Sequence, residues 1–291
     1  MSADPREPWT HQQAIVNGVR LHWVEAGSGP LVLLLHGFPE FWYSWRHQVP
    51  ALAAAGFRVL APDLRGYNLS DKPPGVAGYR LEALTGDVAG LIAHAGAASA
   101  AVVGHDWGGG IAWTLAMRRP ELVRKLAVLN APHPAVFLRE LRRPGQLLRS
   151  WYMFFFQLPW LPELLLRAGN YALLERTLRR DPVRPGAFTE DDIRRYKEAL
   201  SQPGARTAAI NYYRAAFRRM RSASRGMAPV TVPTLLIWGE QDRYLGRRMT
   251  EGLDRWVPDI RVARLPDASH WVQQDAPERV NEFLAGFLSA G

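Results

Sequence analysis

The segment that most constrains this chain is a short apolar strand that runs into a glycine-rich turn and then into a helix. Strand and turn read VVGHDWGGG at 102–110, and IAWTLAMRR follows as a helix. Small residues on both sides of such a turn let strand and helix approach closely, as in the nucleophile elbow G-x-S-x-G. Asp106 stands in the place of the serine, so we predict a carboxylate nucleophile. The alternative is that Asp106 only caps the helix.

Two further side chains complete a catalytic arrangement in the chain order nucleophile, acid, histidine. Asp242 follows the apolar run LLIWGEQ, and His270 lies in the loop after the next expected strand. We predict that His270 activates water and that Asp242 orients its ring. Asn130 ends an earlier strand, but it is an amide and cannot serve as the acid. The backbone N–H groups of Phe38 and Trp107 are predicted to form an oxyanion hole.

Short apolar runs alternate with helical stretches along most of the chain, which predicts an α/β fold with a mostly parallel, doubly wound sheet. The expected strands are Leu21–Val24, Leu31–Leu35, Arg58–Ala61, Ala100–Val103, Leu126–Leu129, Leu235–Trp238 and Val262–Leu265. The pattern stops at 132, and residues 133–228 carry helical character without a strand signal. We therefore expect a core of 1–132 and 229–291 with an inserted helical cap over 133–228, where such sheets bind ligands.

The absence of cysteine among the 291 residues excludes a disulfide, a thiolate nucleophile and a cysteine metal site. The formal net charge is +9, and residues 133–228 alone carry +10. We favour solvated arginine-rich helices as the reason. Attraction of an anionic substrate, a membrane surface or nucleic acid is the alternative. The start shows no signal-peptide pattern, and the most apolar stretch, 151–166, is too short to span a bilayer, so we expect a soluble, cytoplasmic protein.

Six segments together resemble the epoxide hydrolases of the α/β-hydrolase fold, which are relatives of haloalkane and haloacetate dehalogenases. The segments are HGFPEFWYSWRHQ at 36–48, DLRGYNLSDKP at 63–73, GHDWGG at 104–109, NAPHP at 130–134, WGEQD at 238–242 and SHWVQQDAPE at 269–278. The resemblance covers nearly the whole chain from about Gln12. It implies the same fold and the same nucleophile, acid, base and oxyanion-hole positions: Asp106, Asp242, His270, Phe38 and Trp107.

The resemblance also implies two cap tyrosines that donate hydrogen bonds to the epoxide oxygen. Tyr152 in SWYMFFFQ matches the first and Tyr213 in NYYR the second, with Tyr212 as the neighbouring alternative. A phenol can stabilise the negative charge that ring opening puts on oxygen. Spacing alone would favour packing aromatics of the cap. Glu40 matches a carboxylate that helps to hold the hydrolytic water in some members.

The expected reaction opens an apolar epoxide to a vicinal diol through an alkyl ester on Asp106, with no cofactor and no metal. Further residues expected to bind substrate or water are His36, Pro39, Trp151, Met153 and Phe154. One alternative is a haloalkane or haloacetate dehalogenase with the same nucleophile. Another is a ligand-binding protein that kept the fold without turnover, which the intact triad disfavours. The expected partner is a small hydrophobic epoxide rather than nucleic acid, in a monomer or homodimer.

Overall fold

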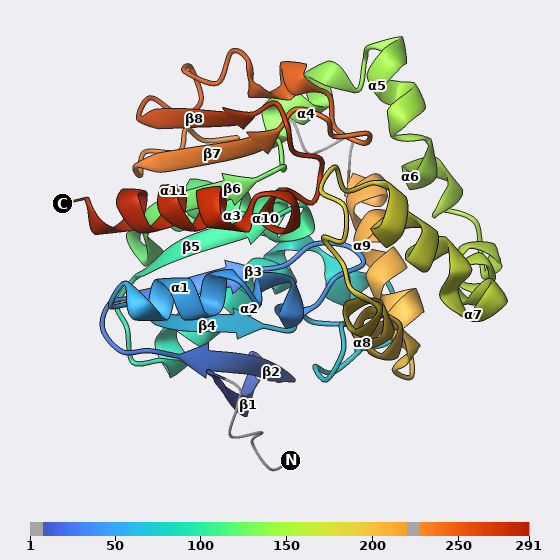
Figure 1. The fold of residues 1–291 in the computed structure, drawn as a ribbon, viewed down its shortest axis with the longest axis horizontal. Helices are drawn as coiled ribbons and strands as arrows, with labels where there is room; N and C mark the ends of the chain where they lie inside the picture. The colour runs from blue at the N-terminus through green and yellow to red at the C-terminus, as the bar shows by residue number, and fades with distance from the viewer. Residues whose placement is uncertain (1–7, 220–226, 291) are drawn as a thin grey trace.

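The computed structural model describes residues 8–219 and 227–290. Its sheet has eight strands in the order β1-β2-β4-β3-β5-β6-β7-β8 (Figure 1). The strands are β1 Thr10–Val16, β2 Val19–Ala26, β3 Leu31–Leu35, β4 Arg58–Pro62, β5 Ala100–His105, β6 Val123–Leu129, β7 Thr234–Gly239 and β8 Ile260–Leu265. β2 pairs antiparallel with β1 and β4, and the pairs from β4 to β8 are parallel. The predicted, mostly parallel sheet is confirmed.

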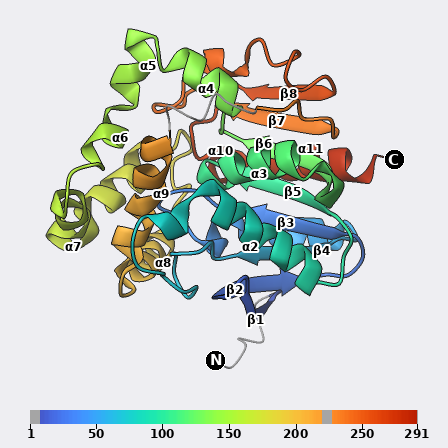
Figure 2. The ribbon, with the colours of Figure 1, turned by 180° about the vertical axis from the view of Figure 1, so that it is seen from behind.

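Helices cover both faces of the sheet (Figures 1 and 2). One face carries α1 Gln48–Ala54 and α11 Pro277–Ser289, which contact each other, with α10 Val272–Asp275 just before α11. The other face carries α2 Leu81–His94 and α3 Trp107–Arg118. Every residue of β3, β5 and β7 is buried. Burial between two helical layers explains why these strands are continuously apolar rather than alternating.

The segment predicted as the cap lies between β6 and β7 in the chain and gathers at one side of the sheet (Figure 1). We call helices α4 to α9 the cap. They are α4 Pro134–Glu140, α5 Pro144–Arg149, α6 Trp151–Phe155, α7 Leu161–Arg180, α8 Glu190–Ser201 and α9 Ala205–Arg219. Residues 220–226 of the predicted cap and 1–7 of the start lie outside the described residues, and the domain boundaries stay a prediction. Within the described residues, no helix is both long and apolar enough to cross a membrane.

Strand β1 differs from expectation, because the sequence analysis gave no strand before Leu21. Its sequence THQQAIV is mostly polar, and only Val16 is fully buried, since β1 is an edge strand that pairs with β2 alone. Apolar alternation is weak in such a strand. The missed signal is the turn: Asn17 and Gly18 both have positive φ, 51° and 75°, as a two-residue Asn-Gly hairpin requires.

Candidate active site

Asp106 sits at the apex of the turn between β5 and α3, with φ 49° and ψ −115°. A positive φ is costly for a non-glycine residue and is held only by tight surroundings. A Cβ on Gly108 would lie 2.0 Å from the Leu35 carbonyl oxygen, and one on Gly104 would lie 2.3 Å from the Gly108 carbonyl oxygen. The glycines therefore let strand and helix close on each other. The Asp106 side chain makes no capping hydrogen bond to α3, which removes the capping alternative.

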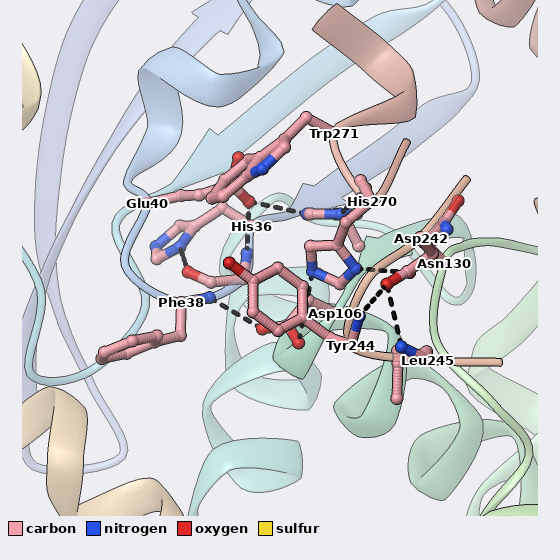
Figure 3. A network of polar contacts seen from close by, with 12 residues as sticks. His36, Phe38, Glu40, Asp106, Asn130, Asp242, Tyr244, Leu245, His270 and Trp271 are labelled. Atoms are coloured by element: carbon pink, nitrogen blue, oxygen red, sulfur yellow. Dashed lines mark hydrogen bonds and ion pairs between the residues drawn. The ribbon is translucent and has the colours of Figure 1, made fainter. Parts of the chain in front are cut away.

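The three predicted catalytic side chains lie together at the carboxyl ends of their strands (Figure 3). His270 Nε2 lies 3.8 Å from Asp106 Oδ2, and His270 Nδ1 lies 2.7 Å from Asp242 Oδ2. The His270 ring therefore stands between the two carboxylates. The Asp242 side chain is fully buried, whereas the Asp106 side chain keeps 17% of its surface exposed. That difference suits Asp106 to meet a substrate and Asp242 to act only through histidine.

Asp242 is fixed by hydrogen bonds on both carboxylate oxygens. Its Oδ1 accepts the backbone N–H groups of Tyr244 at 2.7 Å and Leu245 at 2.8 Å. Its Oδ2 accepts the Asn130 side-chain amide at 2.8 Å in addition to His270. Asn130 is held in turn, because its Oδ1 accepts the Gly239 N–H at 2.8 Å. Asn130 is thus a support for the acid, a role that the sequence analysis did not assign to it.

The pKa values of the triad follow from burial and from its charges. Burial raises the pKa of Asp106, and the positive neighbours His270 and His105 offset this only in part. Burial also acts to raise the pKa of Asp242, but the charge and hydrogen bond of His270 outweigh it and leave that pKa lowered. Burial acts to lower the pKa of His270, but the surrounding carboxylates, led by Asp242 and then Asp106, raise it to about 9.

The two backbone N–H groups predicted to form an oxyanion hole lie beside the Asp106 carboxylate. The Phe38 N–H donates a hydrogen bond of 2.8 Å to Asp106 Oδ1, and the Trp107 N–H acts with it to lower the pKa of the same carboxyl group. A Cβ on Gly37 would lie 2.5 Å from Asp106 Cβ, so glycine is what allows this loop to approach the nucleophile. Two backbone donors on one carboxyl group are suited to a negative charge that develops on its oxygen.

Tyr152 on α6 and Tyr213 on α9 face the same region from the cap. Their ring centroids lie 5.8 Å apart, and the Tyr213 ring lies 5.2 Å from Phe38 and 5.0 Å from Trp107. Burial, with the Asp106 carboxylate as the next cause, raises the pKa of both phenols well above the usual value. Tyr212 points elsewhere, because its hydroxyl donates to the Arg65 carbonyl oxygen at 2.6 Å inside the core.

Comparison with known proteins identifies the family. Residues 30–277 match the family model of the alpha/beta hydrolase fold. The chain is 46% identical to the AB hydrolase superfamily protein YfhM of Bacillus subtilis, over 94% of this chain and 95% of that protein. It is 42% identical to human epoxide hydrolase 4, over 94% of this chain and 76% of that protein. The crystal structure of the Bacillus megaterium epoxide hydrolase with an inhibitor superposes with a TM-score of 0.88 at 36% identity, over 96% of this chain and 100% of that one. The chain belongs to the epoxide hydrolases of the α/β-hydrolase fold.

Not every residue predicted for this epoxide hydrolase site faces it. Both ring nitrogens of His36 form hydrogen bonds with backbone groups. Nδ1 donates to the Gly37 carbonyl oxygen at 2.9 Å, and Nε2 accepts the Leu64 N–H at 3.0 Å. Trp151 is largely exposed, and Phe154 packs against Phe217 on the outer side of the cap. The structure thus does not bring these three side chains into the site.

Met153 does join the apolar cluster above the nucleophile. It packs there with Tyr213 and with Phe156, which the sequence analysis did not single out. Phe38 and Trp107 border the same cluster, and Pro39 is partly buried beside Phe38. These side chains form an apolar wall on the cap side of Asp106.

Glu40 and His105 form a buried ion pair behind the triad. Glu40 Oε2 lies 2.7 Å from His105 Nδ1 and accepts the Gly37 N–H at 3.0 Å, and its Oε1 accepts the Ser44 hydroxyl. Burial acts to raise the pKa of Glu40, but His105 and these hydrogen bonds lower it to about 2. His105 Nε2 donates to the His270 carbonyl oxygen at 2.9 Å. The pair therefore links the backbone at Gly37 to the backbone of His270.

Proposed function

We propose that this chain hydrolyses an apolar epoxide to a vicinal diol in two half-reactions, joined by an alkyl ester on Asp106. One observation carries the proposal: a single elbow carboxylate has the Phe38 N–H at 2.8 Å on one oxygen and His270 Nε2 at 3.8 Å from the other. Nucleophile, oxyanion donor and base therefore converge on one carboxyl group. The relatives named epoxide hydrolases support the same class of reaction.

In the first half-reaction, Asp106 Oδ2 attacks a ring carbon of the epoxide. We assign the attack to Oδ2 because Oδ1 accepts the Phe38 N–H. The bond between that carbon and the epoxide oxygen breaks, and the oxygen takes a proton from Tyr152 or Tyr213. Burial keeps both phenols protonated in the free enzyme, so each can serve as the donor.

In the second half-reaction, water attacks the carbonyl carbon of the ester. His270 takes one proton from the water, and the negative charge develops on Oδ1, where the backbone N–H groups of Phe38 and Trp107 stabilise it. Collapse of this intermediate breaks the bond to Oδ2. The second proton of the water goes to the leaving oxygen, and His270 keeps the proton that it took from the water, which restores its protonated form in the free enzyme.

The charge of Asp106 couples the two half-reactions. In the free enzyme the Asp106 carboxylate is one of the groups that raise the pKa of His270 to about 9, which favours the protonated ring. An ester carries no charge, so alkylation removes that contribution. The pKa of His270 then falls, and the ring gives its proton to the tyrosinate that ring opening left behind. The neutral ring can therefore act as a base on water only after the ester has formed.

Trapping the ester tests the proposal. His270→Gln should still be alkylated but should not release product, so mass spectrometry should find the enzyme heavier by one substrate on the peptide that carries Asp106. Wild type should show no such accumulation under the same conditions. If His270→Gln still forms diol and carries no adduct, the covalent route is wrong.

Isotope labelling tests the same route in the wild type. A single turnover in ¹⁸O water should place the label in Asp106 and unlabelled oxygen in the diol. Direct attack of water on the epoxide predicts the reverse. A substrate panel of styrene-, cyclohexene- and fatty-acid-type epoxides, beside haloalkanes and fluoroacetate, tests the reaction class. If the enzyme turned over only the halogenated compounds, it would be a dehalogenase and the proposed epoxide substrate would be wrong.

A further inference from the structure

The outer side of the cap collects almost all of the exposed apolar side chains of this chain. Among the described residues, twelve large apolar side chains are exposed, and eleven of them lie between residues 147 and 183. The exposed fraction reaches 74% for Leu148, 72% for Trp160, 61% for Trp151 and 59% for Leu164. A large exposed apolar cluster on a folded domain marks a surface that meets a partner.

These side chains follow one another at helical spacing along the chain. Exposed apolar residues recur every three or four positions from Leu147 on α5 through Trp151 and Phe154 on α6 to Leu158, which lies just after α6. On the first turns of α7, Leu161, Leu164 and Leu165 follow the same spacing. Figures 1 and 2 both show α5, α6 and α7 in succession along one outer edge of the cap. We call this surface the outer cap face, formed by exposed residues of 147–165.

The charges around the outer cap face are positive. Residues 141–180 contain seven arginines and two glutamates, a formal charge of +5. Both glutamates are already paired, Glu163 with Arg214 and Glu175 with two cations. Arg142, Arg167, Arg176 and Arg180 are exposed and form no ion pair with any residue of 8–219 or 227–290. The stretch of chain that carries the apolar side chains therefore also carries exposed arginines that are available to meet an anionic surface.

We propose that the outer cap face docks on an anionic phospholipid membrane. Tryptophan and leucine on one side of a helix, with arginine beside them, suit the boundary between headgroups and acyl chains, where arginine stems lie along apolar surface and guanidinium groups reach the phosphates. A second copy of this chain fits less well, because a two-fold contact through this face would bring together two segments of net positive charge.

Vesicle co-sedimentation tests the proposal on the full chain. The protein should pellet with phosphatidylcholine vesicles that contain phosphatidylglycerol, and far less with phosphatidylcholine alone. Raising the salt concentration should weaken the binding, since the charge attraction is screened. Arg167→Gln with Arg176→Gln should lower partitioning about five-fold for each arginine removed. Leu148→Ser with Leu164→Ser should lower it by about ten-fold or more.

Matched controls come from exposed residues outside the cap. Ile15→Ser removes the one other exposed large apolar side chain of the described residues, which is 78% exposed on β1. Arg261→Gln removes an exposed arginine near the start of β8, the strand end opposite the site. Neither should change partitioning, and circular dichroism should show that all four variants fold like wild type.

Three results would overturn the proposal. The first is wild-type protein that stays in the supernatant with anionic vesicles. The second is binding that Ile15→Ser or Arg261→Gln lowers as much as the cap variants do. The third is a dimer that the cap variants dissociate without any vesicle binding, which would assign the face to a second copy. None of these results depends on the chemistry proposed for Asp106, because the readout is partitioning rather than turnover.

Discussion

Replacing Asn130 by glycine tests the support beneath Asp242, the proposed catalytic acid. The change removes the amide that donates to Asp242 Oδ2 at 2.8 Å and the oxygen that accepts the Gly239 N–H at 2.8 Å. Glycine is the suitable replacement, because Asn130 has φ 39°, which alanine would adopt only with strain. The backbone can therefore stay in place while these two hydrogen bonds are lost, together with a longer third one from the Asn130 amide to the Gly239 carbonyl oxygen at 3.2 Å.

The loss of the two shorter bonds has two different consequences. A hydrogen bond to a charged group contributes about 1.5–3 kcal/mol, so Asp242 should hold the positive form of His270 less strongly. If the full loss raises the free energy of the transition state for ester hydrolysis, the rate of that step falls about ten- to hundred-fold. Leaving the buried Gly239 N–H without its acceptor costs a further 1–3 kcal/mol or so of stability. Alkylation of Asp106 should change little, because Asn130 does not touch the nucleophile.

Rapid-quench single turnover separates the two rates. Asn130→Gly should form the ester at nearly the wild-type rate and then accumulate it. Asn68→Gly is a matched control, because Asn68 has φ 38° and donates at 2.9 Å to the buried carboxylate of Asp63, away from the triad. Asn68→Gly should lower stability without accumulation of ester. If both variants lose stability and neither slows hydrolysis, Asn130 only braces the fold.

Three other outcomes follow from the same geometry. Tyr213→Phe should slow ester formation by about 10²–10³-fold, the usual effect of losing one oxyanion donor. Tyr212→Phe should leave that rate unchanged, because the Tyr212 hydroxyl donates to a backbone oxygen in the core. Burst kinetics measure both rates. Folding raises the pKa of His270 from its ordinary 6.5 to about 9. The stability that the protonated ring contributes is therefore complete below pH 6.5 and is lost as the pH rises through 9. Urea unfolding between these pH values should show this loss of stability, and His270→Gln should abolish the pH dependence. Gly108→Ala should prevent soluble expression because its Cβ would lie 2.0 Å from a backbone oxygen, while Gly110→Ala, whose Cβ meets nothing within 4 Å, should express and fold normally.

The parts of the structure that the sequence predicts best are those that local chemistry determines. A buried parallel strand must be apolar throughout, so the central strands were recognisable as runs, and the predicted fold is confirmed. The elbow was recognisable because two glycines are needed where β5 meets α3. Strand β1 was missed because an edge strand buries little and can remain polar. Its Asn-Gly turn was the better signal, since the turn depends on backbone geometry rather than on burial.

The parts that could not be predicted depend on which way a side chain points across long separations. The sequence shows of Asn130 only that it is an amide and cannot serve as the catalytic acid. Its role depends on Asp242, 112 positions later, approaching to within 2.8 Å. His105 and Tyr244 are similar cases. His105 reaches the His270 carbonyl, and the Tyr244 ring lies 5.3 Å from the His270 ring while its hydroxyl bonds Asp181 of the cap. No spacing rule connects residues that only the completed sheet brings together.

Helix α6 shows why composition misplaced part of the pocket. In WYMFFFQ almost every side chain is apolar, so a search for buried residues selects the whole segment. The helical repeat divides it: Tyr152, Met153 and Phe156 turn toward the nucleophile, whereas Trp151 and Phe154 turn outward. A helix that only lined a pocket would be expected to carry polar residues on its outer side. The outward aromatics are therefore a second apolar face of one short helix, and a membrane-docking cap accounts for that face as the substrate accounts for the inner one.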